Sequence, residues 1–193
     1  ATRLPTGVFP AELSEHAFAV LREAYPSVEP IEDALSGALM NAGPIIHPPL
    51  IMMNAGPLEH FDTWDIHNEG TQPSIRRVTN QLDAERMAVR EALGYGAPHF
   101  PLADHYNSTE GEEWMYGRGA PRQLTDTRLG LSLLVSVGRW AGVPTPIAQG
   151  LLSIASAVAG RDLYAEGRTL ENLGLAGLDR AQMSSLLTQG CPR

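Results

Sequence analysis

The most informative stretch of the chain is Asn41-Ala-Gly-Pro-Ile-Ile-His47-Pro-Pro-Leu-Ile-Met-Met-Asn54-Ala-Gly-Pro-Leu-Glu59. It places one histidine in an otherwise apolar run with prolines at 44, 48 and 49. A proline inside a helix has no N–H, so the carbonyl four residues earlier loses its partner and the axis bends. Unpartnered carbonyls beside a titratable ring suit a polar substrate. A lone histidine in an apolar run is usually a core residue, but these prolines make His47 the first candidate for chemistry.

The composition narrows the classes of protein and of chemistry. The chain has 193 residues, 43% hydrophobic and 19% charged, which is typical of a globular domain with a sizeable core. Its formal net charge of -8 argues against a nucleic-acid partner, which would need a basic surface. All 14 basic residues are arginine. Lysine Schiff-base chemistry is therefore excluded within the chain, and proton transfer falls to histidines and carboxylates.

Nothing in the sequence indicates a membrane or secreted protein. The apolar runs are broken by His, Pro, Ser or Gly, and the N-terminus lacks the pattern of a signal peptide. Cys191 is the single cysteine, so neither an internal disulfide nor a cysteine metal site is expected. We therefore expect a cytoplasmic protein.

The hydrophobic periodicity predicts a mainly α protein preceded by a little α/β structure. A strand is expected over 4–10 and a helix over 11–25, with an apolar face made of Leu13, Ala17, Val20, Leu21 and Ala24. From about residue 31 the pattern is helical. We expect residues 1–30 to be the last strand and helix of a dinucleotide-binding domain, and residues 31–193 to be a helical substrate and catalytic domain.

Several helices of the second part have clear signals. The stretch 74–93 predicts a long helix with Asp83, Glu85, Arg86 and Arg90 on its solvent-exposed side. Helices are also expected over 127–141 and from 146 to about 158, and a last one begins at Asp179 with a capping box to Gln182. The stretch 107–121 predicts a loop.

The tetrad Asn-Ala-Gly-Pro occurs twice, at 41–44 and 54–57. Asn and Gly favour the end of a helix, and a following proline cannot continue it. Because residues 45–53 keep the same apolar character, we expect a kink at the first tetrad and a helix end at the second.

A histidine that acts as a general acid or base needs a carboxylate to orient its ring. Asp126 lies at the start of an apolar helix, where the commonest role of aspartate is the N-cap and a catalytic partner is the less frequent alternative. Arg118, Arg122 and Arg128 surround it and could hold a carboxylate, although surface ion pairing is the commoner outcome.

Other polar clusters are less specific. The run from Glu59 to Glu69 holds six potential metal ligands but matches no metal-binding spacing, so a solvated loop is favoured over a metal site. His99 and His105 could line a cleft. The Gly117-Arg-Gly119 sequence does not complete a dinucleotide-binding fingerprint.

Residues 41–178 resemble the C-terminal helical domain of opine dehydrogenases, the octopine, nopaline and carboxyethyl-norvaline dehydrogenase group. The resemblance is carried by ordered motifs across most of the chain. They are Ile45-Ile-His47-Pro48, Met53-Asn54-Ala-Gly56, Glu69-Gly70-Thr-Gln-Pro73-Ser74, Asp83-Ala-Glu85-Arg86, Asp126 with Gly130-Leu131, Val143-Pro144-Thr145-Pro146 and Glu166-Gly167-Arg168-Thr169-Leu170-Glu171-Asn-Leu173-Gly174.

The resemblance implies a multi-helical domain similar to the C-terminal domain of 6-phosphogluconate dehydrogenase. It implies that an amino acid and a 2-oxo acid condense to an imine that NADH or NADPH reduces. His47 would be the general acid/base and Asp126 would orient it. The carboxylate-binding arginine of the family is matched most nearly by Arg122, with Arg128 as the alternative, and Asn54 is expected to contact substrate.

The resemblance also implies partners and rivals. The family's Rossmann domain, which holds most of the NAD or NADP, is not in this chain, so the chain is expected not to turn over alone, and a homodimer is left open. Another 2-oxo-acid reductase with the same helical domain would use lysine, which is missing here. A non-catalytic binding or dimerisation module is the second rival, and it would not need His47 and Asp126 to face each other.

Overall fold

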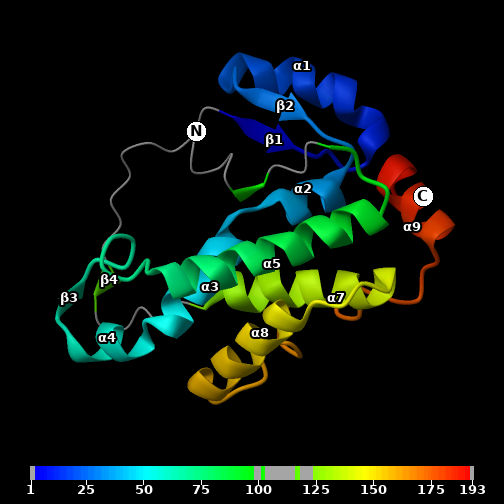
Figure 1. Ribbon diagram of the computed structural model, residues 1–193. Coiled ribbons are helices and arrows are strands. Elements are labelled where there is room, and N and C mark those ends of the chain that lie inside the picture. Colours follow the sequence, from blue (N-terminus) through cyan, green and yellow to red (C-terminus); the bar gives the residue numbers. More distant parts are fainter. Residues whose placement is uncertain (1–2, 98–100, 103–115, 118–123, 192–193) are drawn as a thin grey trace.

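The structure is a computed structural model that describes residues 3–97, 101–102, 116–117 and 124–191 (Figure 1). Its N-terminal part is a small strand–helix–strand unit. Strand β1 (Leu4–Thr6) leads into a 3-10 turn η1 (Ala11–Leu13) and helix α1 (Ser14–Ala24), and β2 (Val28–Pro30) pairs with β1 in parallel. The strand and helix predicted there are present, but the first strand is shorter than expected and a second strand follows the helix.

The predicted apolar face of α1 is not buried within the described chain. Leu13 and Val20 are 51% and 60% exposed, and Phe18 is the buried residue of this helix. The two-stranded sheet is too small to cover the face that the periodicity marks as apolar. Leu13 and Val20 are therefore left at the surface, while Phe18 is buried.

The rest of the described chain is mainly helical, as predicted. Figure 1 shows α5 and α7 running alongside each other with α3 behind them and α8 beneath. The elements in order are α2 (Ala34–Met40), α3 (Gly43–Met53), α4 (Ala55–His60), β3 (Thr63–Trp64), α5 (Pro73–Ala92), β4 (Tyr116–Gly117), the π-helix η3 (Asp126–Leu131), α7 (Ser132–Ala141), α8 (Pro146–Ala159) and α9 (Arg180–Gln189).

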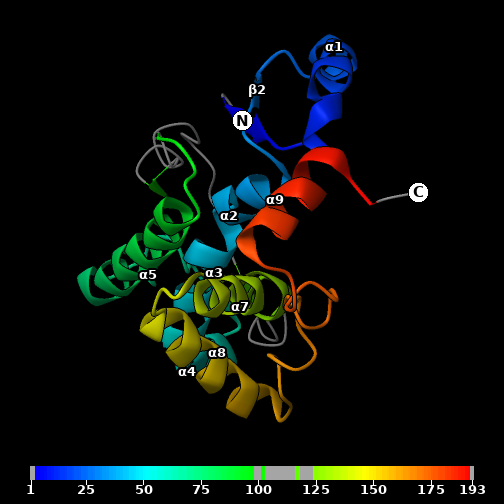
Figure 2. The same ribbon diagram turned by 90° about the vertical axis from the view of Figure 1, so that its right-hand side faces the viewer.

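Helix α3 lies at the centre of the core. It packs against η3, α5 and α8, and its apolar residues are buried on most sides, as the sequence predicts. Figure 2 shows α9 on the side of α2, where it contacts η1, and its residue Met183 is buried in the same core. The buried residues that surround α3 include Leu82, Val89, Leu131, Leu134, Val137, Leu151 and Leu152.

The two Asn-Ala-Gly-Pro tetrads have the opposite roles from those expected: the first ends a helix, and the second joins two helices. At the first, Asn41 is extended (φ -61°, ψ 120°) and α2 ends, so α3 begins as a new helix with Pro44 in its first turn. At the second, Asn54 is the junction between α3 and α4, and the N–H of Leu58 still bonds to its carbonyl. The predicted kink is therefore a true break, because the side chain of Asn41 accepts from the N–H of Gly43 and fixes the turn.

The prediction that Asp83, Glu85, Arg86 and Arg90 form a solvent-exposed side of α5 (Pro73–Ala92) is wrong. Asp83, Glu85, Arg86 and Arg90 are all buried, Arg90 completely. Their charges are compensated inside the protein, which the helical periodicity cannot indicate. Arg86 pairs with Asp83 at 2.6 Å and also donates to the Leu39 carbonyl, while Arg90 donates to the Ser36 carbonyl at 2.7 Å.

Glu85 has a distinct structural role, because its carboxylate caps helix α8. It accepts hydrogen bonds from the backbone N–H groups of Ile147 and Ala148, at 2.7 and 3.0 Å. A buried carboxylate is stabilised at a helix N-terminus by the helix dipole and the free N–H groups. The N-cap residue Thr145 makes no such bond with its side chain. Glu85 therefore joins α5 to α8.

Other helix boundaries follow the predicted signals. Helix α8 begins after the Gly142–Thr145 turn, where Gly142 has a φ of 75°, and α9 has the predicted capping box of Asp179 and Gln182. The predicted loop 107–121 lies outside the described residues, apart from β4. In the part of the chain that the structure describes, every helix is too short or too polar to cross a membrane.

Candidate active site

The structure brings His47 and Asp126 together. His47 lies in the middle of α3, and its Nδ1 is 2.6 Å from Oδ2 of Asp126, 79 residues further along the chain. The side chains are 34% and 38% exposed, so the pair lies at the surface of the core, within reach of a ligand. The alternative in which His47 and Asp126 are buried in separate cores does not fit this geometry.

Two glycines allow α3 and η3 to approach closely enough for this contact. A Cβ on Gly130 would overlap the ring of Pro44, so only glycine lets η3 pack against the start of α3. A Cβ on Gly43 would lie 3.3 Å from both carboxylate oxygens of Asp126. The Gly43-Pro44 step, one turn before His47, therefore holds the aspartate in place.

The N-cap interpretation of Asp126 is wrong. Thr125 is the N-cap, and Asp126 is the first residue of the π-helical segment. Its carboxylate is used by His47 rather than by the backbone of its own helix. Such π-helical turns occur frequently at functional sites, because the wider turn moves side chains out of α-helical register.

The geometry fixes which nitrogen of His47 is available to a ligand. Nδ1 faces the carboxylate, so in the neutral ring it carries the proton and donates it to Asp126. Nε2 is then the acceptor in the neutral ring and a donor in the protonated ring. The carboxylate can stabilise the positive charge that forms when Nε2 takes a proton. The pair can therefore exchange a proton with a ligand at Nε2.

Pro48 and Pro49 lie inside α3 directly after His47. Because neither has an N–H, the carbonyls of Pro44 and Ile45 have no helical partner four residues later. These carbonyls belong to the turn that precedes the histidine. Pro44 and Ile45 are buried, and contact of their carbonyls with a polar substrate remains a prediction.

Of the three candidate arginines for carboxylate binding, Arg128 lies within the described residues. Arg122 and Arg118 lie outside the described residues. Arg128, in η3 two residues after Asp126, donates from Nη1 to the carbonyl of Glu166 at 3.1 Å. Arg128 thus ties η3 to the segment after α8, and its contact with a carboxylate remains a prediction.

Asn54 is buried, and its amide is used by the protein itself. Nδ2 donates to the carbonyls of Leu50 and Gly70, at 2.9 and 3.2 Å, and Oδ1 accepts from Nε1 of Trp64 at 3.1 Å. Both amide donors are therefore occupied. The structure shows Asn54 as a clamp between the end of α3 and the segment 64–70, while substrate contact by this residue remains a prediction.

A second histidine, His67, is affected by the charge of His47 and was not singled out by the sequence. Burial lowers its pKa below the ordinary histidine value, and the charge of His47 lowers it further, against a smaller opposite effect of Asp65. Its Nε2 is buried and has no hydrogen-bond partner among the described residues. The sequence around His67 matches no metal-binding spacing and therefore offers no reason to select this residue. His99 and His105 lie outside the described residues.

The acidic and histidine run 59–69 contains the turn that carries His67. The Asp65 carboxylate accepts from the N–H groups of His67 and Asn68, which lowers its pKa, with the Asn68 side chain as the largest cause. Within the described ranges no group of three or more His, Cys, Asp or Glu side chains is arranged to hold a metal ion.

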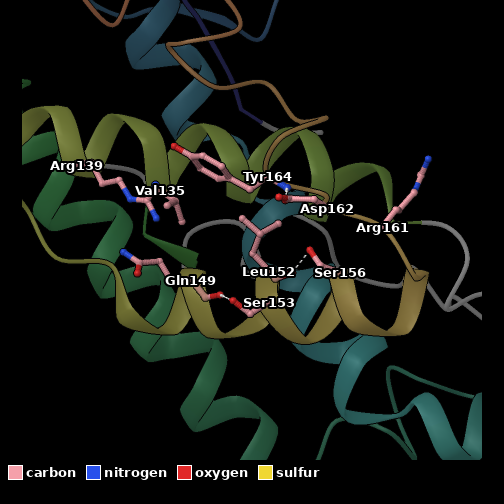
Figure 3. A pocket seen from close by; sticks show the side chains of 9 residues that line it. All are labelled: Val135, Arg139, Gln149, Leu152, Ser153, Ser156, Arg161, Asp162 and Tyr164. Atoms are coloured by element: carbon pink, nitrogen blue, oxygen red, sulfur yellow. Dashed lines mark hydrogen bonds between the residues drawn. The ribbon is translucent and has the colours of Figure 1, made fainter.

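A separate cavity of about 410 Å³ lies between α7 and α8 (Figure 3). Arg139 from α7 stacks over the ring of Tyr164 at 4.7 Å, and Arg161 pairs with Glu166 at 3.1 Å. Neither member of the dyad lines this cavity. The charged groups around it already have partners in the protein, so the dyad remains the stronger candidate for chemistry.

The residues present do not form a cradle for a dinucleotide. The strand–turn–helix of β1 and α1 has one glycine in its turn, Gly7, and a Cβ there would overlap the backbone carbonyl of Asp33. Gly7 is thus used for packing against the turn before α2, whereas a pyrophosphate needs several glycines before a helix. The described part of the chain therefore offers no dinucleotide site of this type.

Residues 30–159 match the family model described as NAD/NADP octopine/nopaline dehydrogenase, alpha-helical domain. The chain belongs to this family. The matched range contains both His47 and Asp126, together with every helix from α2 to α8 that the structure describes. The family resemblance predicted from the sequence is thereby confirmed, and with it the mainly helical fold.

Two relatives show how much of such a protein the chain represents. The chain is 29% identical over 192 residues to an opine dehydrogenase of Arthrobacter sp. (strain 1C), covering 91% of this chain and 54% of that protein. It is 29% identical over 164 residues to a vitopine synthase of Allorhizobium ampelinum, covering 76% and 45%. The chain therefore spans about half the length of these relatives.

Proposed function

We propose that this chain is the substrate-binding and catalytic half of an opine dehydrogenase. The proposed reaction joins an amino acid to a 2-oxo acid. The amine nitrogen bonds to the 2-oxo carbon, the oxo oxygen leaves as water, and the resulting C=N bond is reduced to a secondary amine. The observation that carries the proposal is the 2.6 Å contact of His47 with Asp126 within the matched helical domain.

His47 would manage the protons of this reaction at Nε2. In its protonated form it donates a hydrogen bond to the 2-oxo oxygen, which polarises the carbonyl toward attack by the amine. The oxygen leaves as water with this proton and one proton released by the attacking amine, whose nitrogen keeps its other hydrogen in the reduced product. Asp126 keeps the ring oriented and stabilises its positive charge, so the proton is delivered from one fixed position. Without lysine in the chain, histidine is the side chain best suited to this role near neutral pH.

The substrates carry carboxylates, and arginine is the side chain that binds them with two parallel hydrogen bonds. We assign this role to an arginine near Asp126. Arg122 is the first candidate from the family pattern. Arg128 is the alternative, since it lies in the same π-helical segment and one of its guanidinium nitrogens is already fixed on Glu166.

The hydride donor would be NAD(P)H, bound mainly by a dinucleotide-binding half. When bound, this cofactor supplies the hydride that reduces the C=N carbon. Residues 1–30 would be the end of that half, and residues 31–193 the helical domain. Two observations support this division: the chain spans about half of its relatives, and the apolar face of α1 with Leu13 and Val20 is uncovered. A further layer of the same domain would bury that face.

The product of the complete enzyme tests the proposal. The protein that carries both halves is incubated with NADPH or NADH, a 2-oxo acid and an amino acid, and the product is analysed by mass spectrometry. We expect a secondary amine whose mass equals the two substrates minus water plus two hydrogens. A 2-hydroxy acid formed without an amino acid would instead indicate a simple 2-oxo-acid reductase. Binding without turnover would favour the non-catalytic module.

A further inference from the structure

His67 lies in a turn that is fastened on both sides. Asp65 accepts from the N–H of His67 at 3.2 Å, and its other carboxylate oxygen accepts from the Asn68 side chain at 2.7 Å. Ile66 is completely buried in the core on one side of the histidine. On the other side, the Gly70 carbonyl is held by Asn54. The backbone that carries the imidazole is therefore fixed in place.

The same clamp connects the turn to the helix of the dyad. Asn54 follows α3 directly, seven residues or about two turns after His47, and so lies on the same side of the helix axis. Gly70 is packed so closely that a Cβ there would lie 2.9 Å from Oδ1 of Asn54. The turn thus sits against the end of α3. His67 is close enough to His47 for the charge of one ring to act on the other.

The Nε2 atom of His67 has no partner among the described residues, although it is buried. A buried polar atom without a hydrogen bond is unfavourable, and such atoms in folded proteins usually have a partner that is a ligand, an ion or water. A bound ligand would supply the missing partner.

We propose that His67 is a second substrate-contacting residue of the site, and that its Nε2–H donates a hydrogen bond to a carboxylate of the bound amino acid or 2-oxo acid. The assignment rests on the proposed function, which supplies a carboxylate on each substrate. In a chain without lysine, anions can be bound by only arginine or histidine among charged side chains. A neutral imidazole can donate from Nε2 without being charged, which suits a buried position.

The test uses the complete enzyme and three variants. His67→Leu removes the donor with little change in volume, and His67→Gln restores an N–H donor near the position of Nε2. His60→Gln changes an exposed histidine seven residues earlier and is the matched control. The apparent KM for the amino acid and for the 2-oxo acid, kcat and the melting temperature are measured for each.

We expect His67→Leu to raise the KM of one substrate by about 10- to 100-fold, the range for a lost hydrogen bond to a charged group, with a much smaller change in kcat. His67→Gln should restore most of the affinity, and His60→Gln should match the unchanged enzyme. The substrate whose KM rises identifies the carboxylate: a rise for the amino acid and a rise for the 2-oxo acid are the two supporting outcomes.

Two results would overturn the assignment. The first is an active enzyme in which His67→Leu leaves both KM values unchanged. The second is an equal rise of both KM values in the Leu and Gln variants together with a lower melting temperature, which indicates a structural role in the turn. An unchanged enzyme that oxidises neither NADH nor NADPH with any such substrate pair would overturn the proposed function and this assignment with it.

Discussion

Pro44 and Gly130 are in such close contact that a side chain on Gly130 would overlap the proline ring. This contact sets the distance between α3 and η3, and therefore between His47 and Asp126. Replacing Gly130 by alanine must push the two helices apart or force the proline aside. Overpacking of this kind destabilises a protein by about 1–3 kcal/mol.

Gly130→Ala is therefore expected to lower both the free energy of unfolding, by about 1–3 kcal/mol, and kcat. Urea unfolding and steady-state kinetics measure the two effects. Gly150→Ala is the control, since Gly150 lies in α8 with open space around it and the substitution should stabilise the helix by about 0.5–1 kcal/mol. Equal stability of the two variants would show that the Pro44 contact carries no constraint.

Asp126→Asn should reduce kcat while leaving the fold intact. The amide keeps the size of the side chain but cannot stabilise a positive imidazole, and it can turn its NH₂ toward Nδ1 and favour the wrong tautomer. The comparable change in a catalytic triad costs about 10⁴-fold in kcat. Glu59→Gln, at an exposed carboxylate, is the control and should leave kcat unchanged. If Asp126→Asn kept the kcat of the unchanged enzyme, the carboxylate would have no role in the proton transfer.

Glu85→Gln tests the cap of α8. The amide can accept from only one of the two N–H groups that the carboxylate now serves, and its NH₂ group would face the other donor. We expect a loss of about 1.5–3 kcal/mol in the free energy of unfolding, measured with urea, because these are bonds to a buried charge. Glu23→Gln, on the exposed side of α1, should change it by less than about 0.5 kcal/mol. Similar losses in both variants would argue against a specific cap.

Asn54→Ala tests the clamp on the 64–70 segment. Without the amide, the Gly70 carbonyl and Nε1 of Trp64 lose their partner, so this segment should open more often than the rest of the protein. Amide hydrogen exchange read by mass spectrometry should show faster exchange in peptides that cover 61–72. The exposed Asn80→Ala in α5 should leave the exchange unchanged. A loss of substrate affinity without faster exchange would instead assign Asn54 to the substrate.

The pH dependence of stability should contain a contribution from His67. Its pKa in the folded protein lies below that of the unfolded chain, because burial and the charge of His47 oppose protonation. The unfolded state therefore binds more protons, and stability falls as the pH drops from about 6.5, the ordinary histidine value, through the lowered pKa. His67→Gln should lose less stability between pH 7.5 and pH 5 than the unchanged protein. An identical loss in both would contradict a depressed pKa.

The sequence predicts the His47–Asp126 pair better than it predicts the residues that surround the pair. His47 stands out because of three prolines in an apolar run, and Asp126 is identified by the family motif that follows it. The helix boundaries with local signals, such as the capping box at Asp179, are also predicted correctly. These features depend on residues that are close in sequence or part of a recognised pattern.

The buried charges of α5 and the role of His67 could not be predicted in this way. Glu85 is buried because it caps a helix that begins more than 60 residues later, and helical periodicity treats such a carboxylate as solvent-exposed. His67 is selected because its Nε2 atom is buried without a hydrogen-bond partner among the described residues. Only the folded structure can show this. Both depend on contacts between distant parts of the chain.

The most direct test of the central claim is the effect of His47→Ala on NAD(P)H oxidation by the complete enzyme in the presence of a 2-oxo acid and an amino acid. Loss of a general acid/base reduces the rate by about 100- to 10,000-fold, so we predict a decrease of that size with a folded protein by circular dichroism. Full activity of the His47→Ala enzyme would contradict the assignment of His47 and Asp126 as its catalytic pair.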